Sequence, residues 1–239
     1  MDYEAGEILC FDKPYRWTSF DLVGRVRWAL CRSLGIKKLK VGHAGTLDPL
    51  ATGVMIVCTG RATKRIDQLQ AETKEYVATI ALGATTPSFD LEHPIDATYP
   101  TAHITRELVE QSLQKFLGRI EQVPPAFSAC KVNGKRAYKL ARKGEDVELK
   151  PKILVLDEIE LLSGPQPAEP APDGTPLLSI TIRVVCSKGT YIRAWARDIG
   201  LALGSGGHLT ALRRTRVGDV RVENCLNPEE FINELTSSL

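Results

Sequence analysis

A single acid, Asp48, stands in a run of small and glycine residues, VGHAGTLDPLATG, which covers residues 41–53. The only other ionisable side chain of this run is His43. Its three glycines let the chain turn tightly and let a ligand approach the backbone closely. Pro49 biases Asp48 away from a helical conformation. A carboxylate presented in this way can act as a nucleophile or a general base, although an Asp-Pro pair is more often a turn or a helix cap.

No motif of the sequence indicates a metal site or a bound nucleotide. The glycine-rich run fits neither the pattern G-x-x-x-x-G-K-[ST] nor the pattern G-x-G-x-x-G. The six cysteines are scattered without a C-x-x-C pair, and the four histidines lack the spacing H-E-x-x-H. We therefore expect free thiols in a reducing compartment and no metal.

Composition indicates an ordinary globular chain without an export or membrane signal. Of its 239 residues, 43% are hydrophobic and 25% are charged, as in typical folded domains. The acidic start MDYEAGEILCF lacks the basic and apolar regions of a secretory signal. No apolar run reaches membrane-spanning length. We expect a cytoplasmic protein.

Positive charge is concentrated in three segments that contain no acid, although the net charge is only +2. They lie between residues 21 and 48, 121 and 145, and 198 and 219. Their cations are Arg25, Arg27, Arg32, Lys37, Lys38 and Lys40; Lys131, Lys135, Arg136, Lys139, Arg142 and Lys143; and Arg213, Arg214 and Arg216. One such run alone is usually a solvated face. If the three converge in space, they form a surface for phosphate, and together they favour nucleic acid.

The elements that must position these residues are a mixture of helices and strands. We expect strands at 6–11, 53–59, 74–82, 152–162 and 176–186, and helices at 61–70, 105–117, 191–203 and from residue 228. Thr18 and Asp21 resemble a capping box that opens a further helix ending at Gly35. No βαβ rhythm is present, so we expect an α+β fold with a mixed, largely antiparallel sheet flanked by helices. We expect one domain over residues 1–239, with an exposed proline-rich loop at about 163–176.

Longer stretches resemble a known family. The segment GHAGTLDPLATGVMIVCTGRATK, residues 42–64, is similar to the signature block of the TruB family of pseudouridine synthases. The segments LCFDKPYRWTS, KEYVATIALGATT, PPAFSACKVNGKRAYKLAR and CSKGTYIRAWARDIG also resemble family motifs, in family order. The resemblance implies the pseudouridine synthase fold and an enzyme that isomerises uridine 55 in the T-arm of tRNA after base flipping. Composition and periodicity alone indicate only an α+β protein with basic segments.

The resemblance also assigns catalytic roles. The reaction breaks the bond from uracil N1 to ribose C1′ and rejoins the base through C5, so no atoms are exchanged and no cofactor is required. Asp48 matches the catalytic aspartate, and Arg193 matches the arginine that pairs with it and keeps it charged. Tyr76 matches the tyrosine that stacks on the flipped uracil and can move a proton. On residue type alone, Tyr76 would be an ordinary strand aromatic and Arg193 a surface charge.

Further residues match binding positions. His43 resembles the histidine that fills the space vacated by the flipped base, although a hydrogen-bonded loop residue is an equal alternative. Lys13, Tyr191, Leu212 and Lys64 match lining or supporting positions, although a core role is the simpler reading of Leu212. Residues 124–152 correspond to an inserted thumb over the RNA, where Lys135, Arg136 and Arg142 would contact phosphates.

The expected partner is the tRNA T-arm, bound by a monomer without a guide RNA or a membrane. The chain ends soon after NPEEFINEL, so we expect it to lack the C-terminal RNA-binding domain of many relatives. Two alternatives are open on sequence alone. One is an RNA-binding or tRNA-folding chaperone without essential catalysis. The other is a hydrolase of a glycosidic bond, a class that usually needs two acids.

Overall fold

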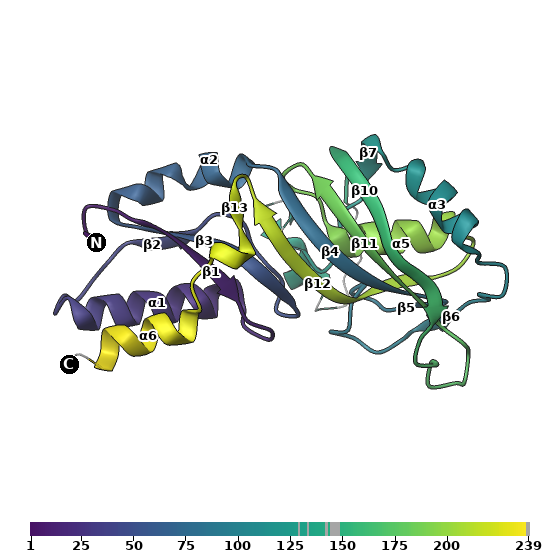
Figure 1. Cartoon of the computed structure of the whole chain (residues 1–239), viewed down its shortest axis with the longest axis horizontal. Coiled ribbons are helices and arrows are strands. Elements are labelled where there is room, and N and C mark those ends of the chain that lie inside the picture. Colours follow the sequence, from purple (N-terminus) through teal and green to yellow (C-terminus); the bar gives the residue numbers. More distant parts are fainter. Residues whose placement is uncertain (129, 133, 142, 144–148, 238–239) are drawn as a thin grey trace. The chain divides into compact units, whose positions relative to one another are not determined.

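The computed structural model describes residues 1–128, 130–132, 134–141, 143 and 149–237. The chain divides into two compact units, residues 1–76 with 212–239, and residues 77–211. It passes from one unit to the other within two strands, β4 (Lys74–Leu82) and β12 (Gly207–Val217). Both units contain strands and helices (Figure 1).

The first unit is built on strand β3 (Ala51–Thr59). Its strands follow the order β1-β3-β12, where β1 (Ile8–Lys13) is antiparallel to β3 and β12 is parallel to it. Strand β2 (Val41–His43) also pairs with β3, and β13 (Val220–Arg221) pairs with β12. The helices are α1 (Ser19–Ser33), η1 (Gly60–Arg65), α2 (Ile66–Ala71), η2 (Val222–Asn224) and α6 (Pro228–Ser237).

Residues 54–58 of strand β3 are all apolar because both faces of the strand are covered. Met55 and Val57 pack with Phe11, Leu22 and other residues of β1 and α1. The alternate residues of β3, Val54, Ile56 and Cys58, pack in a second cluster with Ala44, Val217 and Val222. This alternation follows from the two-residue period of a strand. Helices α1 and α6 lie side by side (Figure 1), and Phe231 of α6 meets the ring of Phe11 edge-on.

Helix α1 begins and ends as the sequence predicts. The Thr18 side chain accepts a hydrogen bond from the backbone nitrogen of Asp21, and the Asp21 carboxylate accepts one from the backbone nitrogen of Thr18. The capping box is therefore confirmed. After the helix, Gly35 has a φ of +65°, and its backbone nitrogen donates to the Arg32 carbonyl. A positive φ at this position is the usual way in which a helix ends.

The second unit is an antiparallel layer with helices. Its strands follow the order β12-β4-β11-β10-β7, with β11 (Leu178–Cys186), β10 (Lys152–Pro167) and β7 (Gly118–Gln122). The remaining elements are β5 (Ala84–Thr85), β6 (Ala97–Thr98), β8 (Lys131–Val132), β9 (Lys135–Arg136), α3 (Arg106–Gln114), α4 (Ala137–Ala141) and α5 (Ile192–Ala202). Trp195 of α5 is fully buried and meets the Phe116 ring edge-on.

The expected exposed loop at 163–176 is partly wrong. Residues 163–167 continue β10 through register shifts, with Gln166 opposite Ser179 and Pro167 opposite Leu178 in β11. Ala171 is buried, and the Thr98 side chain donates a hydrogen bond to the Asp173 carboxylate. Proline content suggested a loop, but bulges let a strand accommodate these residues.

The fold class is confirmed. The sheet is mixed and mostly antiparallel, β12 and β3 form a parallel pair, and helices flank the sheet. Strand β4 runs from Lys74 to Leu82, as predicted, whereas β1 begins and ends two residues later than expected. Among the helices that the structure describes, none is long and apolar enough to span a bilayer.

Candidate active site

Asp48 lies in the turn that joins β2 to β3, and the protein holds this turn from several sides. Ser19, which is buried, donates a hydrogen bond from its hydroxyl to the Leu47 carbonyl and accepts one from the Leu47 nitrogen, both at 2.9 Å. The Pro49 carbonyl accepts a hydrogen bond from the Arg16 backbone nitrogen at 2.8 Å. Asp48 itself is half-buried. The turn is thus fixed while its acid retains access to solvent.

Lys13 supports the Asp48 turn from within the protein. Its side chain is fully buried, and its Nζ atom donates to the carbonyls of Pro14 (2.9 Å), Trp17 (2.6 Å) and Pro49 (3.4 Å). Burial lowers the pKa of Lys13 to about 8, against the opposing effect of the negative charge on Asp48. The cation therefore interacts electrostatically with Asp48 and also holds the residue that follows it.

Arg214 is the second buried cation beneath this turn. Only 1% of its surface is exposed, and its guanidinium donates to the carbonyls of Val54 (2.8 Å), Thr46 (3.3 Å) and Gly45 (3.2 Å). Gly53, paired with Arg214 in the β3–β12 ladder, has a φ of +107°, and a Cβ there would lie 2.1 Å from the Arg214 carbonyl oxygen. Glycine is therefore required where the turn enters β3.

The third basic run is accordingly not an open phosphate surface. Arg214 is buried, Arg213 pairs with Asp12 at 2.7 Å, and Arg216 pairs with Glu75 at 3.7 Å. The conditional prediction of a phosphate surface does not extend to Arg214, which is buried, and acids already pair with Arg213 and Arg216. The run gave no sign that one arginine is buried, since that depends on carbonyls far away in the sequence.

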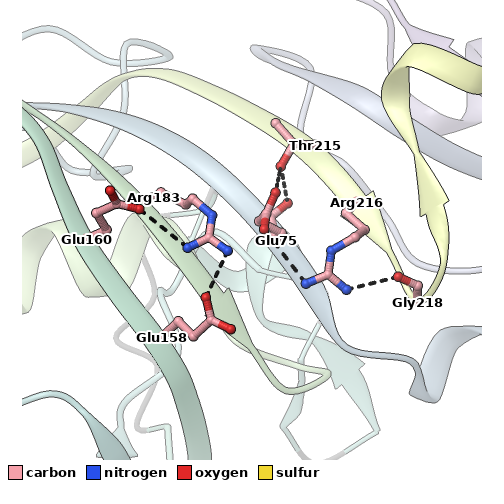
Figure 2. Close-up of polar contacts among 7 residues, drawn as sticks. All are labelled: Glu75, Glu158, Glu160, Arg183, Thr215, Arg216 and Gly218. Carbon is pink, nitrogen blue, oxygen red and sulfur yellow. Dashed lines mark hydrogen bonds and ion pairs between the residues drawn. The ribbon is translucent and has the colours of Figure 1, made fainter.

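Tyr76 follows Glu75 in β4, and polar contacts hold the Glu75 side chain in place (Figure 2). Thr215 donates a hydrogen bond to the Glu75 carboxylate at 2.8 Å, and Arg216 joins that carboxylate to the Gly218 carbonyl, to which it donates at 3.0 Å. Successive side chains of a strand point to opposite faces, so Tyr76 faces away from this network. Tyr76 is buried, with 7% of its surface exposed. Sequence reasoning missed Glu75, which reads as one more charged strand residue.

His43, Leu212 and Lys64 belong to the same unit as Asp48. His43 is half-buried on β2, and burial, reinforced by Arg214, lowers its pKa. Its ring meets the ring of Phe20 edge-on, with centroids 6.4 Å apart. Leu212 pairs in register with Ala51, just after the Asp48 turn, and is half-buried instead of a core residue. Lys64 is exposed on η1.

Arg193 lies in the second unit and is not a surface charge. It is 6% exposed in the first turn of α5, and it donates to the carbonyls of Ser88 (3.1 Å) and Phe127 (3.0 Å). Its Nε atom lies 3.7 Å from the carboxylate of Asp90, a buried acid that sequence reasoning missed. Asp48 belongs to the other unit, and its pairing with Arg193 stays a prediction.

Tyr191 is positioned by the end of β7. Gln122, which is buried, accepts a hydrogen bond from the Tyr191 nitrogen at 2.9 Å and donates one to its carbonyl at 3.2 Å. The Tyr191 hydroxyl lies 3.2 Å from the sulfur of Cys130. Burial, followed by Cys130, raises the pKa of Tyr191, so the hydroxyl stays protonated. Burial would raise the pKa of Cys130 too, but hydrogen bonds with Tyr191 and Ser128 and the charge of Lys152 outweigh it and lower this pKa.

The expected thumb is described only in part. Lys135 and Arg136 form β9, which pairs with β8 in a short hairpin, and α4 follows. Arg142 lies outside the described residues. Phosphate binding by these three residues therefore stays a prediction.

Known protein families match most of the chain. Residues 32–192 match the family model described as TruB family pseudouridylate synthase (N terminal domain), and residues 193–237 match the tRNA pseudouridylate synthase B C-terminal domain. The chain is 71% identical to tRNA pseudouridine synthase B of Bacteroides thetaiotaomicron, over 97% of this chain and 93% of the relative. It is 47% identical to the protein of the same name from Flavobacterium johnsoniae, over 98% of each.

The fold likeness agrees with the family match. A chain in a crystal structure of a Cbf5-Nop10-Gar1 complex is 26% identical, with a TM-score of 0.66 over 99% of this chain. This chain spans 57% of that solved chain. The expected pseudouridine synthase fold is confirmed by this likeness together with the family models. The chain belongs to the TruB family of pseudouridylate synthases.

Proposed function

We propose that this enzyme isomerises uridine 55 in the T-arm loop of tRNA, with Asp48 as the catalytic residue. The relatives that are 71% and 47% identical are both named tRNA pseudouridine synthase B, and the likeness extends over nearly the whole chain. The observation that carries the proposal is the Asp48 turn. Ser19, Lys13 and Arg214 fix its backbone, and the acid remains half-exposed. A tRNA substrate makes the cytoplasm the expected site of action, and we expect a monomer.

The reaction needs a held carboxylate and a sheltered base. The bond from N1 to C1′ breaks, the uracil turns, the bond from C5 to C1′ forms, the proton on C5 leaves, and N1 gains a proton. In this proposal Asp48 is the nucleophile or base that starts the sequence. Hydrogen bonds from buried groups to the carbonyls on both sides of Asp48 keep the carboxylate in one place, which lowers the cost of reaching the transition state.

Other residues take the roles that the family resemblance assigns. Tyr76 stacks on the flipped uracil, and Arg193 steadies the Asp48 carboxylate. His43 fills the space that the flipped base leaves, and its lowered pKa keeps it neutral there near pH 7. Tyr191 and Leu212 line the base site, and Lys13 supports it. Base flipping of this kind is general among enzymes that act on a nucleobase.

Tritium release tests the proposal directly. A T-arm hairpin labelled with [5-³H]uridine loses its tritium only when C5 is joined to the sugar. We expect release by the native enzyme and none by Asp48→Asn, while the exposed-acid control Asp67→Asn retains native release. Release by Asp48→Asn at the native rate contradicts the role of Asp48. Bound but unchanged RNA with the native protein would indicate a folding or binding protein, and free uracil would indicate a hydrolase.

The thumb is tested by salt dependence. We expect Lys135→Gln, Arg136→Gln and Arg142→Gln together to weaken hairpin binding and to reduce the slope of log Kd against log salt by about 2. The slope falls because binding releases fewer counterions when phosphate contacts are lost. The control replaces three exposed cations elsewhere, Lys115, Arg119 and Arg221, with glutamine. An unchanged slope in the thumb variant, or an equal fall in the control, contradicts the proposed thumb.

A further inference from the structure

An aromatic side chain lies uncovered beside the Asp48 turn. Phe20 follows Ser19 in the first turn of α1, and Ser19 is the residue whose hydroxyl holds Leu47 of that turn. The Phe20 side chain is 76% exposed, and its described ring neighbour is His43, which it meets edge-on at 6.4 Å. Single exposed apolar residues are common on proteins. This one, however, lies next to a proposed catalytic loop and adds little to the core.

A glycine lies on the same face of the helix, one turn further along. Gly24 is in the interior of α1, where glycine is unfavourable relative to alanine. A Cβ built on Gly24 meets no atom within 4 Å, so packing does not require a glycine here. Its φ is not in the positive range, so backbone conformation does not require one either. Residues four apart lie on one face of a helix, so Phe20 and the bare backbone at Gly24 share a face of α1.

Positive charge continues this face. Arg27, seven residues after Phe20, is exposed, and no ion pair joins it to another residue in the described part of the chain. Arg32 lies over the ring of Trp28, which is 54% exposed. The acid of this helix, Asp21, already accepts hydrogen bonds from Thr18. The face therefore presents an aromatic ring, a bare stretch of backbone and an exposed cation over roughly 10 Å of helix.

We propose that Phe20, Gly24 and Arg27 bind an unpaired nucleotide of the RNA next to the one that reacts. The base stacks on Phe20, the sugar lies against Gly24, and Arg27 pairs with a phosphate. Rings and guanidinium groups combined in this way bind single strands with little dependence on base identity. The inference rests on the proposed function, because it assumes that an RNA loop reaches the Asp48 turn. It makes α1 a positioning surface and gives Phe20 no part in the chemical step.

The test separates positioning from chemistry. We expect Phe20→Ala to raise KM for the T-arm hairpin about tenfold with kcat changed less than twofold, as loss of one stacked base implies, and Phe20→Trp to restore KM. We expect Gly24→Ala to raise Tm and yet to raise KM as well, since its methyl group favours the helix but obstructs the sugar. The control Leu201→Ala removes another exposed apolar side chain, 67% exposed on α5, and is expected to leave KM unchanged.

A binding measurement keeps this test independent of catalysis. In a hairpin with 2-aminopurine at an unpaired loop position, we expect binding to the native protein to quench emission through stacking, and binding to Phe20→Ala to quench it less. Native KM in both Phe20→Ala and Gly24→Ala, with equal quenching, overturns the inference while leaving the proposed function intact. An inactive native enzyme that still shows Phe20-dependent quenching overturns the proposed function alone. Failure of the native protein to bind the hairpin overturns both.

Discussion

Two arginines in two regions of the molecule show how differently the same side chain can serve a fold. Arg214, beneath the Asp48 turn, is 1% exposed and donates to three backbone carbonyls. Arg183, on the surface of the β10–β11 pair, contacts Glu158 at 2.8 Å and Glu160 at 3.5 Å, and both acids are more than half exposed (Figure 2). Exposed ion pairs contribute little to folding stability, whereas removal of a buried charged side chain leaves its hydrogen-bond partners unsatisfied. Burial and the kind of acceptor, rather than charge, decide what each arginine does.

Removing the buried arginine is expected to have the largest effect. Arg214→Ala removes a donor from the carbonyls of Gly45 and Thr46 in the Asp48 turn and of Val54 in β3, so we expect it to lower the free energy of unfolding by about 3–5 kcal/mol. Urea denaturation measures this loss. The control Arg221→Ala, at an exposed position on β13, is expected to change stability by less than about 0.5 kcal/mol. Equal losses in the two variants would remove the distinction between a buried and an exposed arginine.

Replacing the second buried cation is expected to affect activity more than folding. Lys13→Met keeps the length of the side chain but loses the donor to Pro49, so we expect kcat to fall roughly a hundredfold as Asp48 moves from its position. Single-turnover rates on the labelled hairpin measure this. A kcat within threefold of native would show that the lysine does not hold the turn.

The lysine also predicts a dependence of stability on pH. Its pKa is about 8 in the folded protein and about 10.5 in the unfolded chain, so between these values the unfolded state binds more protons. The stability of the native protein relative to Lys13→Met should therefore rise as the pH increases from 8 to 10. Urea denaturation of both proteins across this range checks the sign, and a falling or flat difference contradicts it.

The carboxylate beside Tyr76 is expected to show an intermediate effect. Glu75→Gln keeps an acceptor for Thr215 but removes the charge that faces Arg216, in a site where Glu75 is only 8% exposed. We expect a loss of about 1–2 kcal/mol in stability, measured by urea denaturation. A change below about 0.5 kcal/mol would show that this network contributes no more to stability than an exposed ion pair does.

The smallest effect is expected on the outer surface of β10 and β11. Glu158→Gln removes the negative charge from the shorter contact of Arg183 and leaves Glu160 in place, so we expect a change below about 0.5 kcal/mol that disappears at high salt. Urea denaturation at low and high salt checks both statements. A loss comparable with that of Glu75→Gln would show that exposure does not separate these carboxylates.

Local structure was predictable from sequence where a short pattern determines it. The capping box of Thr18 and Asp21 lies within four residues, and the aromatic and β-branched residues of KEYVATIAL define β4 without help from elsewhere. The family resemblance marked Asp48, and the structure places it in a fixed, half-exposed turn. The capping box and β4 share one cause, since the residues that determine them are close in the chain, whereas Asp48 was marked by the family resemblance alone.

The support beneath the site was not predictable, because it depends on distant contacts. Arg214 looked like one of three arginines in a basic run, and only its tertiary acceptors distinguish it from Arg213. The burial of Glu75 and Asp90 was not predictable either, because the residue type does not show whether a carboxylate is buried or exposed. The strand formed by residues 163–167 was not predicted, because the proline content indicated a loop and the pairing with β11 is not visible in the sequence.

The bond from Arg214 to Val54 joins residues 160 positions apart. A nascent chain therefore carries Asp48 through most of its synthesis without the side chain that completes the turn around it. The loop reaches its final form only when the last part of the chain has left the ribosome. Because non-local contacts of this kind form late in folding, a chain released before residue 214 would contain Asp48 but would not hold its turn in the final form.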